Sequence, residues 1–148
     1  MIYFANRVRG AGVDGRRLKS DARALLDAVG EKTSSLSISL VTDGDIAELN
    51  RLHRGKDRPT DVLSFPLDPS PAAPERLLGD VVISVDTARR QAAEYDAPLQ
   101  NELNRLLIHG ILHVLGHDHE KAAERAIMEA EERRLAAAIG MPWPYDHA

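Results

Sequence analysis

Residues 98–116, PLQNELNRLLIHGILHVLG, form the segment that most constrains the fold. From Leu106 onward its apolar residues cover most of the circumference of a helix, which predicts a helix buried on nearly all sides. Pro98 suits the start of such a helix, and Gly116 suits a left-handed residue that ends it. The fold must therefore place this helix in its interior.

The remaining patterns predict an α+β fold, in which a small mixed β-sheet of about four strands is covered by helices. SLSISLVT alternates apolar and polar residues, and the almost wholly apolar GDVVISVD is typical of a central strand. Strands are predicted at 35–42, 61–66 and 79–86. Further helices are predicted at 20–32, 45–55, 86–96 and 119–139. Because 148 residues suit one domain, residues 1–148 are interpreted as a single unit with a proline-rich loop at 68–76.

The composition narrows the classes of function. The chain has no cysteine, so disulfides and thiolate ligands are excluded and any metal must be bound by nitrogen or oxygen. Neither a signal peptide nor an apolar run of about 20 residues is apparent, which favours a cytoplasmic protein without a membrane partner. The formal net charge of −4 excludes a global basic footprint for nucleic acid, although a local basic patch is compatible with it.

Residues 109–119, HGILHVLGHDH, contain four of the six histidines. His109 and His113 are four residues apart and share one face of the predicted helix, so both can bind one ion. His119 returns after the stop at Gly116. Three nitrogen ligands with a fourth position open to water are typical of a catalytic zinc site, which predicts one zinc ion per chain.

Gly110 occupies the position where zinc proteases with this histidine spacing carry a glutamate as general base. Bound zinc alone can lower the pKa of water to about 7, so hydroxide can form without that glutamate. Phosphodiester cleavage is therefore favoured over peptide cleavage, whose leaving amine also needs a proton. Gly110 itself indicates either tight packing against a neighbouring strand or close approach of a substrate, and the sequence leaves both readings open.

HGILHVLGHDH resembles the signature of the YbeY family, the bacterial metal-dependent endoribonucleases of ribosomal RNA maturation. RGKDRPTDVLSFP at 54–66 and LGDVVIS at 78–84 are also similar to that family, so the resemblance covers about residues 40–130. It implies an α+β fold, zinc on His109, His113 and His119, and cleavage of single-stranded RNA. It further implies a role in 3′-end maturation of small-subunit rRNA and in ribosome quality control, with the small subunit or its factors as partners and no nucleotide cofactor.

The resemblance places the family's important arginine at Arg54. Asp61 departs from the asparagine that many members carry. Arg54, Lys56 and Arg58 lie together in a predicted helix end and loop, and arginine binds phosphate through two parallel hydrogen bonds. We therefore expect Arg54 to act in catalysis, and Lys56 and Arg58 are candidates for RNA binding.

Two aspartates are candidates for orienting a ligand histidine. Asp80 opens the apolar strand at 79–86, and Asp118 precedes His119. A carboxylate in either place could accept a hydrogen bond from the second nitrogen of an imidazole. Each could equally cap a turn.

Two alternatives to the endoribonuclease remain open from the sequence. One is a zinc peptidase, suggested by the ligand spacing but opposed by Gly110. The other is a non-enzymatic ribosome-binding factor with a structural metal. The aromatic content of 4% argues against a platform on which bases stack, so RNA recognition is expected to rest on the backbone and its shape.

Overall fold

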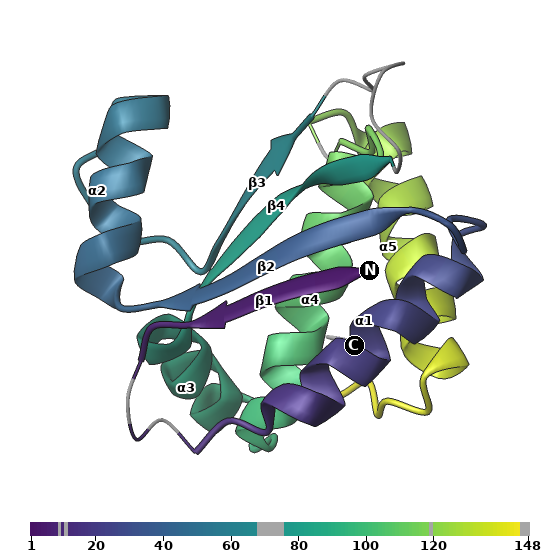
Figure 1. Cartoon of the computed structure of the whole chain (residues 1–148), viewed down its shortest axis with the longest axis horizontal. Helices are drawn as coiled ribbons and strands as arrows, with labels where there is room; N and C mark the ends of the chain where they lie inside the picture. Colours follow the sequence, from purple (N-terminus) through teal and green to yellow (C-terminus); the bar gives the residue numbers. More distant parts are fainter. Residues whose placement is uncertain (9, 11, 68–75, 119, 146–148) are drawn as a thin grey trace.

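The computed structural model describes residues 1–8, 10, 12–67, 76–118 and 120–145. Nine helices and strands lie in these ranges (Figure 1). The strands are β1 (Ile2–Asn6), β2 (Ser35–Val41), β3 (Val62–Pro66) and β4 (Leu77–Ser84). The helices are α1 (Gly15–Ala28), α2 (Asp43–Arg54), α3 (Val85–Glu94), α4 (Leu99–Val114) and α5 (Ala122–Ala138). The predicted α+β class with a four-stranded mixed sheet is confirmed.

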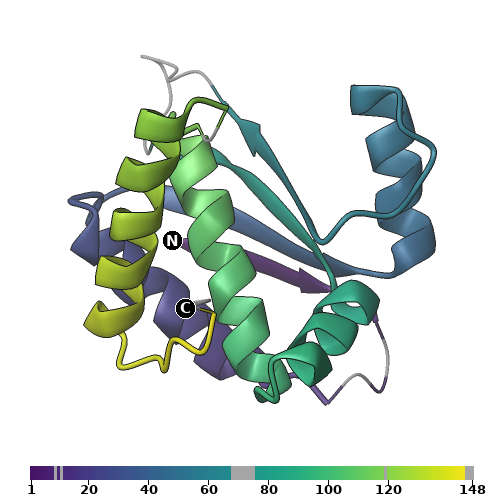
Figure 2. The same ribbon diagram turned by 180° about the vertical axis from the view of Figure 1, so that it is seen from behind.

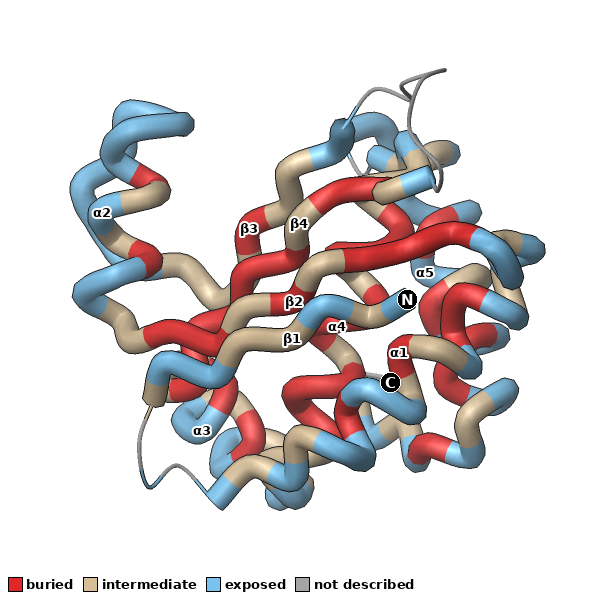
Figure 3. Tube along the Cα trace, viewed as in Figure 1, coloured by how far each residue is buried: buried red, intermediate tan, exposed pale blue. Residues whose placement is uncertain are grey.

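The sheet has the order β1-β2-β4-β3. β1, β2 and β4 are parallel, and β3 pairs antiparallel to β4. β4 is thus an inner strand, as its apolar sequence predicted. α4 crosses one face of the sheet between α5 and α3 (Figure 2), and Figure 3 shows buried residues along β2 and β4 while most of α2 is exposed.

The buried helix that the sequence predicted is α4. Six of its apolar side chains are 2% exposed or less. They are Leu103, Leu106, Leu107, Ile108, Ile111 and Leu112. The helix ends as expected, because Gly116 adopts φ 98° and its N–H donates to the carbonyl of His113, while the N–H of His117 donates to that of Leu112. This pair of bonds turns the chain sharply at the end of the helix.

α2 lies over the opposite face of the sheet from α4. Its Ile46 is fully buried against Val41, Leu63 and Val82. Thr42 caps the start of the helix by accepting a hydrogen bond from the N–H of Asp45. The helix ends at Arg54, so its position on the sheet determines where this arginine is held.

Two elements at the start of the chain differ from the prediction. α1 begins at Gly15, capped by Asp14, and not after Ser20. Leu18 explains the extra turn, because its side chain is completely buried and anchors this part of the helix to the core. β1 was not predicted at all; it is an edge strand that pairs only with β2. α5 also begins at Ala122, three residues later than predicted.

At Gly110, α4 packs closely against the sheet. A Cβ at this position would lie 2.6 Å from Cγ1 of Val81 and 3.2 Å from Oγ of Ser64, and that hydroxyl donates to the Gly110 carbonyl. Val81 is fully buried in the inner strand β4 and cannot move aside. Of the two readings of Gly110, tight packing against a neighbouring strand is therefore the one that the structure supports.

The Gly110→Ala variant is expected to unfold with a free energy about 1–2 kcal/mol lower than that of the parent chain. Overpacking costs about 1–3 kcal/mol, and the better helix propensity of alanine offsets about 1 kcal/mol of it. Urea denaturation measures the difference. Gly44→Ala is the matched control, because its Cβ would meet only Thr42 Oγ1 at 3.8 Å. Equal stability of the two variants would contradict this account of Gly110.

Candidate metal centre

A cavity of about 490 Å³ opens where the end of α2, the start of β3 and α4 meet. Its walls are Arg54, Thr60, Asp61, Val62, Leu63, Ser64, Pro66, His109 and His113. The fold thus brings Arg54 together with His109 and His113, two of the three predicted ligand histidines. Arg54 lies more than 50 residues before either of them in the sequence. The third, His119, lies outside the described residues.

His109 and His113 point at one another from successive turns of α4. Their Nε2 atoms are 3.1 Å apart, and their ring planes are inclined by 70°. Two nitrogens that bind the same tetrahedral zinc at about 2.0–2.1 Å lie about 3.3–3.4 Å apart, so this pair fits two ligands of one ion. Among the residues that the structure describes, no group of three or more potential ligands is placed to hold a metal.

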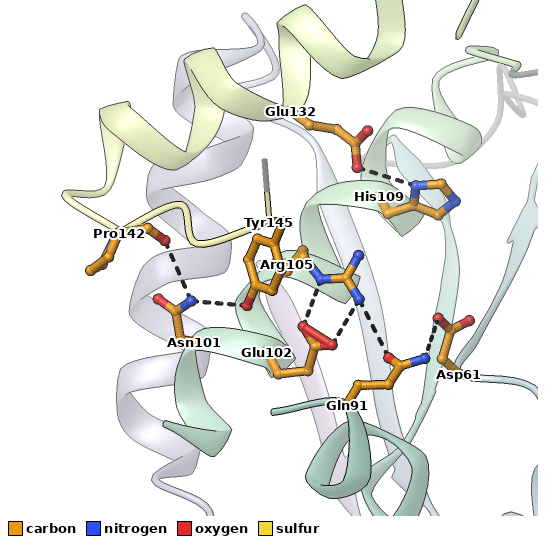
Figure 4. Close-up of polar contacts among 9 residues, drawn as sticks. All are labelled: Asp61, Gln91, Asn101, Glu102, Arg105, His109, Glu132, Pro142 and Tyr145. Carbon is orange, nitrogen blue, oxygen red and sulfur yellow. Dashed lines mark hydrogen bonds and ion pairs between the residues drawn. The ribbon is translucent and has the colours of Figure 1, made fainter. Parts of the chain in front are cut away.

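A carboxylate from α5 supports the first histidine. Nδ1 of His109 lies 3.3 Å from Oε2 of Glu132 (Figure 4). Glu132 is only 9% exposed. A proton on Nδ1, donated to this carboxylate, leaves the lone pair of Nε2 directed toward His113. Carboxylate–histidine–metal arrangements of this kind fix the orientation of the ring and strengthen the ligand. Glu132 was not predicted, because nothing in the Glu-rich sequence of α5 distinguishes it from its neighbours.

We expect the Glu132→Ala variant to bind zinc about 10–100-fold more weakly, since the His109 ring would lose the group that orients it. Competition with a chromophoric chelator measures this affinity directly. Glu131→Ala is the matched control, because the Glu131 carboxylate instead pairs with Arg134 at 2.6 Å. A Glu132 variant that binds zinc as tightly as this control would exclude the supporting role.

The basic residues at the end of α2 are placed differently from one another. Arg54 is the last residue of α2 and lines the cavity. Lys56 and Arg58 are exposed in the following loop and are not among the described residues of the cavity wall. The side chain of buried Asn50 fixes this loop by donating to the carbonyl of Arg58 at 2.9 Å. Arg54 therefore lines the same cavity as His109 and His113, whereas Lys56 and Arg58 lie in the loop after α2 and are not among its described wall residues.

The two candidate aspartates are not equivalent either. Val81 faces Gly110 on α4, so the next side chain along the strand, Asp80, points to the other face of the sheet. There it lines a separate hollow with His53 and Phe65. Asp80 is therefore not positioned to orient either histidine, and that prediction is wrong. Asp118 is exposed just beyond α4, and its role beside His119 stays a prediction.

Asp61 is a wall residue whose carboxylate accepts from three donors. Its Oδ1 accepts from the N–H of Val62 at 2.8 Å and from the hydroxyl of Thr60 at 3.5 Å, and its Oδ2 accepts from Nε2 of Gln91 at 3.3 Å. Gln91 in turn accepts from Arg105, so a chain of polar contacts runs from the cavity into the core of the domain (Figure 4). The one sign of Asp61 in the sequence was that it replaces an asparagine common in the family that the chain resembles.

The chain is similar to known proteins along most of its length. Residues 4–140 match the family model described as endoribonuclease YbeY. The chain belongs to the YbeY family. The stretch that matches includes part of β1 and all of α1 and α5, so the likeness extends well beyond the residues 40–130 that the motifs indicated.

Curated members of the YbeY family resemble the chain closely. An "Endoribonuclease YbeY" of Anaeromyxobacter dehalogenans is 52% identical over 85% of this chain and 65% of its own length. One of Halorhodospira halophila is 39% identical over 97% of this chain and 95% of its own length. The chain thus spans less than two thirds of the length of the first relative but nearly all of the second.

A solved structure shares the fold. The solution structure of TM1509 from Thermotoga maritima superposes with a TM-score of 0.65 and 28% identity, covering 94% of this chain and 89% of that one. In the part of the chain that the structure describes, no helix is both long and apolar enough to cross a membrane.

Proposed function

We propose that this chain is a zinc-dependent endoribonuclease that cleaves single-stranded RNA during 3′-end maturation of small-subunit rRNA and in ribosome quality control. The observation that carries the proposal is the convergence of His109 and His113, with Nε2 atoms 3.1 Å apart, in the same cavity as Arg54. The relatives that share the family are endoribonucleases by description. The proposed partners are rRNA and the small subunit or its factors, in the cytoplasm.

His109, His113 and His119 would hold one zinc ion, which supplies Lewis acidity toward phosphate oxygen and acidifies water. Arg54 lines the same cavity as the histidines from a different element, α2. Its planar guanidinium can bind two oxygens of a phosphodiester and stabilise the negative charge that develops there. The hydroxyls of Thr60 and Ser64 also line the wall, although that of Ser64 already donates to Gly110.

The first test is cleavage of a labelled single-stranded RNA by the zinc-loaded protein and by the same preparation after chelation. We expect cleavage only with metal, and a peptide substrate should stay intact. Cleavage that resists the chelator would point to a contaminating nuclease or a metal-free mechanism. Binding of one zinc without any cleavage, on RNA or on small subunits, would favour the ribosome-binding factor.

Arg54→Ala is expected to lower kcat about 10²–10³-fold, as does the loss of one donor to a developing oxyanion. Zinc stoichiometry should not change, because Arg54 is not a ligand. Arg51→Ala is the matched control, since Arg51 lies three residues earlier in the same helix and pairs with Glu48 on the surface. Single-turnover cleavage separates the two variants, and equal rates would remove Arg54 from the mechanism.

A further inference from the structure

A second hollow, of about 370 Å³, lies beside the candidate metal centre. It is lined by Tyr95, Arg105, Glu129, Glu132, Arg133, Trp143 and Tyr145. The chain has only six phenylalanine, tyrosine and tryptophan residues, and three of them meet here. We call Tyr95, Trp143 and Tyr145 with Arg105 and Arg133 the aromatic pocket. Its composition contrasts with the low aromatic content that argued against base stacking.

Tyr145 is the centre of the aromatic pocket. Its ring meets Tyr95 edge to face at 4.8 Å and Trp143 at 5.0 Å between centroids. The guanidinium carbon of Arg105 lies 4.5 Å from the Tyr145 centroid, and Asn101 donates to the Tyr145 hydroxyl at 2.9 Å. The rings are thus held in place by contacts with α3 and α4 and are not a loose surface cluster.

The protonation of this ring is also fixed. Burial and the nearby charge of Glu102 raise the pKa of Tyr145 to about 12, so it is a neutral phenol at ordinary pH. Asn101 also donates to the carbonyl of Pro142 at 3.4 Å (Figure 4). The segment after α5 is therefore held against α4 by these bonds.

The aromatic pocket adjoins the metal centre through shared walls. Glu132 lines it and also contacts His109. A smaller hollow of about 150 Å³, lined in part by His109, Glu129 and Glu132, lies between the two. Along α4, Arg105 precedes His109 by one turn, or about 6 Å of helix. A polymer whose backbone crosses the histidines can therefore place a neighbouring group in this pocket.

We propose that the aromatic pocket binds an unpaired nucleobase of the RNA, next to the phosphodiester at the metal centre. This inference rests on the proposed function. Aromatic rings and guanidinium planes stack on every base, each contact contributing about 1–3 kcal/mol. The carboxylates of Glu129 and Glu132 would repel a phosphate, whereas a base edge offers both donors for them and acceptors for Arg105 and Arg133. The mixed charge thus favours a base over a backbone phosphate.

The single tryptophan of the chain makes the pocket directly observable, because all tryptophan fluorescence comes from Trp143. We expect a single-stranded oligoribonucleotide to quench it and an abasic ribose–phosphate oligomer of equal length to leave it unchanged at equal occupancy. Fluorescence anisotropy of labelled oligomers measures that occupancy. Quenching that is equal for both oligomers, RNA binding without quenching, or no RNA binding at all would each overturn the proposal.

Substitution of Trp143 tests whether the aromatic pocket contributes to RNA cleavage. Trp143→Ala is expected to raise KM for single-stranded RNA about tenfold and to change kcat less than about twofold, since it removes one stacking contact remote from the reacting bond. Trp143→Phe should restore most of the affinity, and thermal denaturation shows whether each variant folds. Tyr3→Ala is the matched control, as an exposed aromatic on the edge strand β1. An unchanged KM in Trp143→Ala would exclude the pocket.

The two proposals can fail separately. Base-dependent quenching without cleavage would leave the aromatic pocket standing and remove the nuclease function. Metal-dependent cleavage with equal quenching by both oligomers would remove the pocket and leave the nuclease.

Discussion

His113→Ala is expected to abolish RNA cleavage, with a loss of at least about 10³-fold, and to leave the protein without a stoichiometric zinc ion. A catalytic zinc site has three protein ligands, and loss of even an orienting group costs about 10–100-fold, so loss of a ligand costs more. His109 would then lose the nitrogen that lies 3.1 Å from its own Nε2. Zinc content by atomic emission and single-turnover cleavage are measured on the same preparation.

The matched control for this variant is His53→Asn. His53 packs its ring against Phe65, 4.9 Å away, in the hollow on the other face of the sheet. This variant therefore tests whether the loss of an imidazole outside the candidate metal centre also lowers zinc content or RNA cleavage. Full zinc content and full cleavage in His113→Ala would mean that the metal is bound elsewhere and that the paired histidines of α4 do not hold it.

Arg105→Leu is expected to lower the free energy of unfolding by about 3–5 kcal/mol, the usual cost of breaking a buried ion pair by removing one partner. Glu102 is completely buried, and both of its oxygens accept from Arg105, at 2.6 and 2.7 Å. Burial disfavours the charge of Arg105, but its bonds to Glu102 outweigh this effect and raise the pKa of the guanidinium. Among the described residues Arg105 is the cation that pairs with Glu102, so its removal leaves a buried carboxylate without this partner.

The chain contains a matched control for this pair. Arg134 and Glu131 have the same spacing and the same 2.6 Å contact, yet both side chains are partly exposed. Arg134→Leu should therefore cost only about 0–1 kcal/mol. The double variant Glu102→Leu/Arg105→Leu should recover part of the loss, because it removes the unpaired charge. Urea denaturation measures the free energy of unfolding of all these variants. An equal loss in Arg105→Leu and Arg134→Leu would contradict the special role of the buried pair.

The parts of the fold that could be predicted are those whose signal is local. The apolar circumference of α4 and the alternation of β2 depend on residues within a few positions of one another. The start of α1 was wrong because Ser20 is a good cap by type, whereas the burial of Leu18 depends on packing that the local pattern does not contain. β1 was missed because it gains its place only by pairing with a strand more than 30 residues away.

The same distinction separates the predicted from the missed parts of the metal centre. His109 and His113 could be predicted because two residues four apart on a helix must share a face. Glu132 could not, because its place depends on how α5 packs on α4. The place of Asp80 could not be predicted for a related reason. Its side chain points to the opposite face of the sheet from that of Val81, and the sequence does not say which of the two faces α4 covers.

The assembly of this centre from three distant segments has a consequence for synthesis of the protein. Arg54 leaves the ribosome early, the histidines of α4 follow some 55 residues later, and Glu132 arrives only with α5. A nascent chain that stops before α5 has no carboxylate to orient His109 and lacks the helix that covers this side of α4. Such a nascent chain is therefore expected to bind zinc about 10–100-fold more weakly than a chain in which α5 is packed on α4.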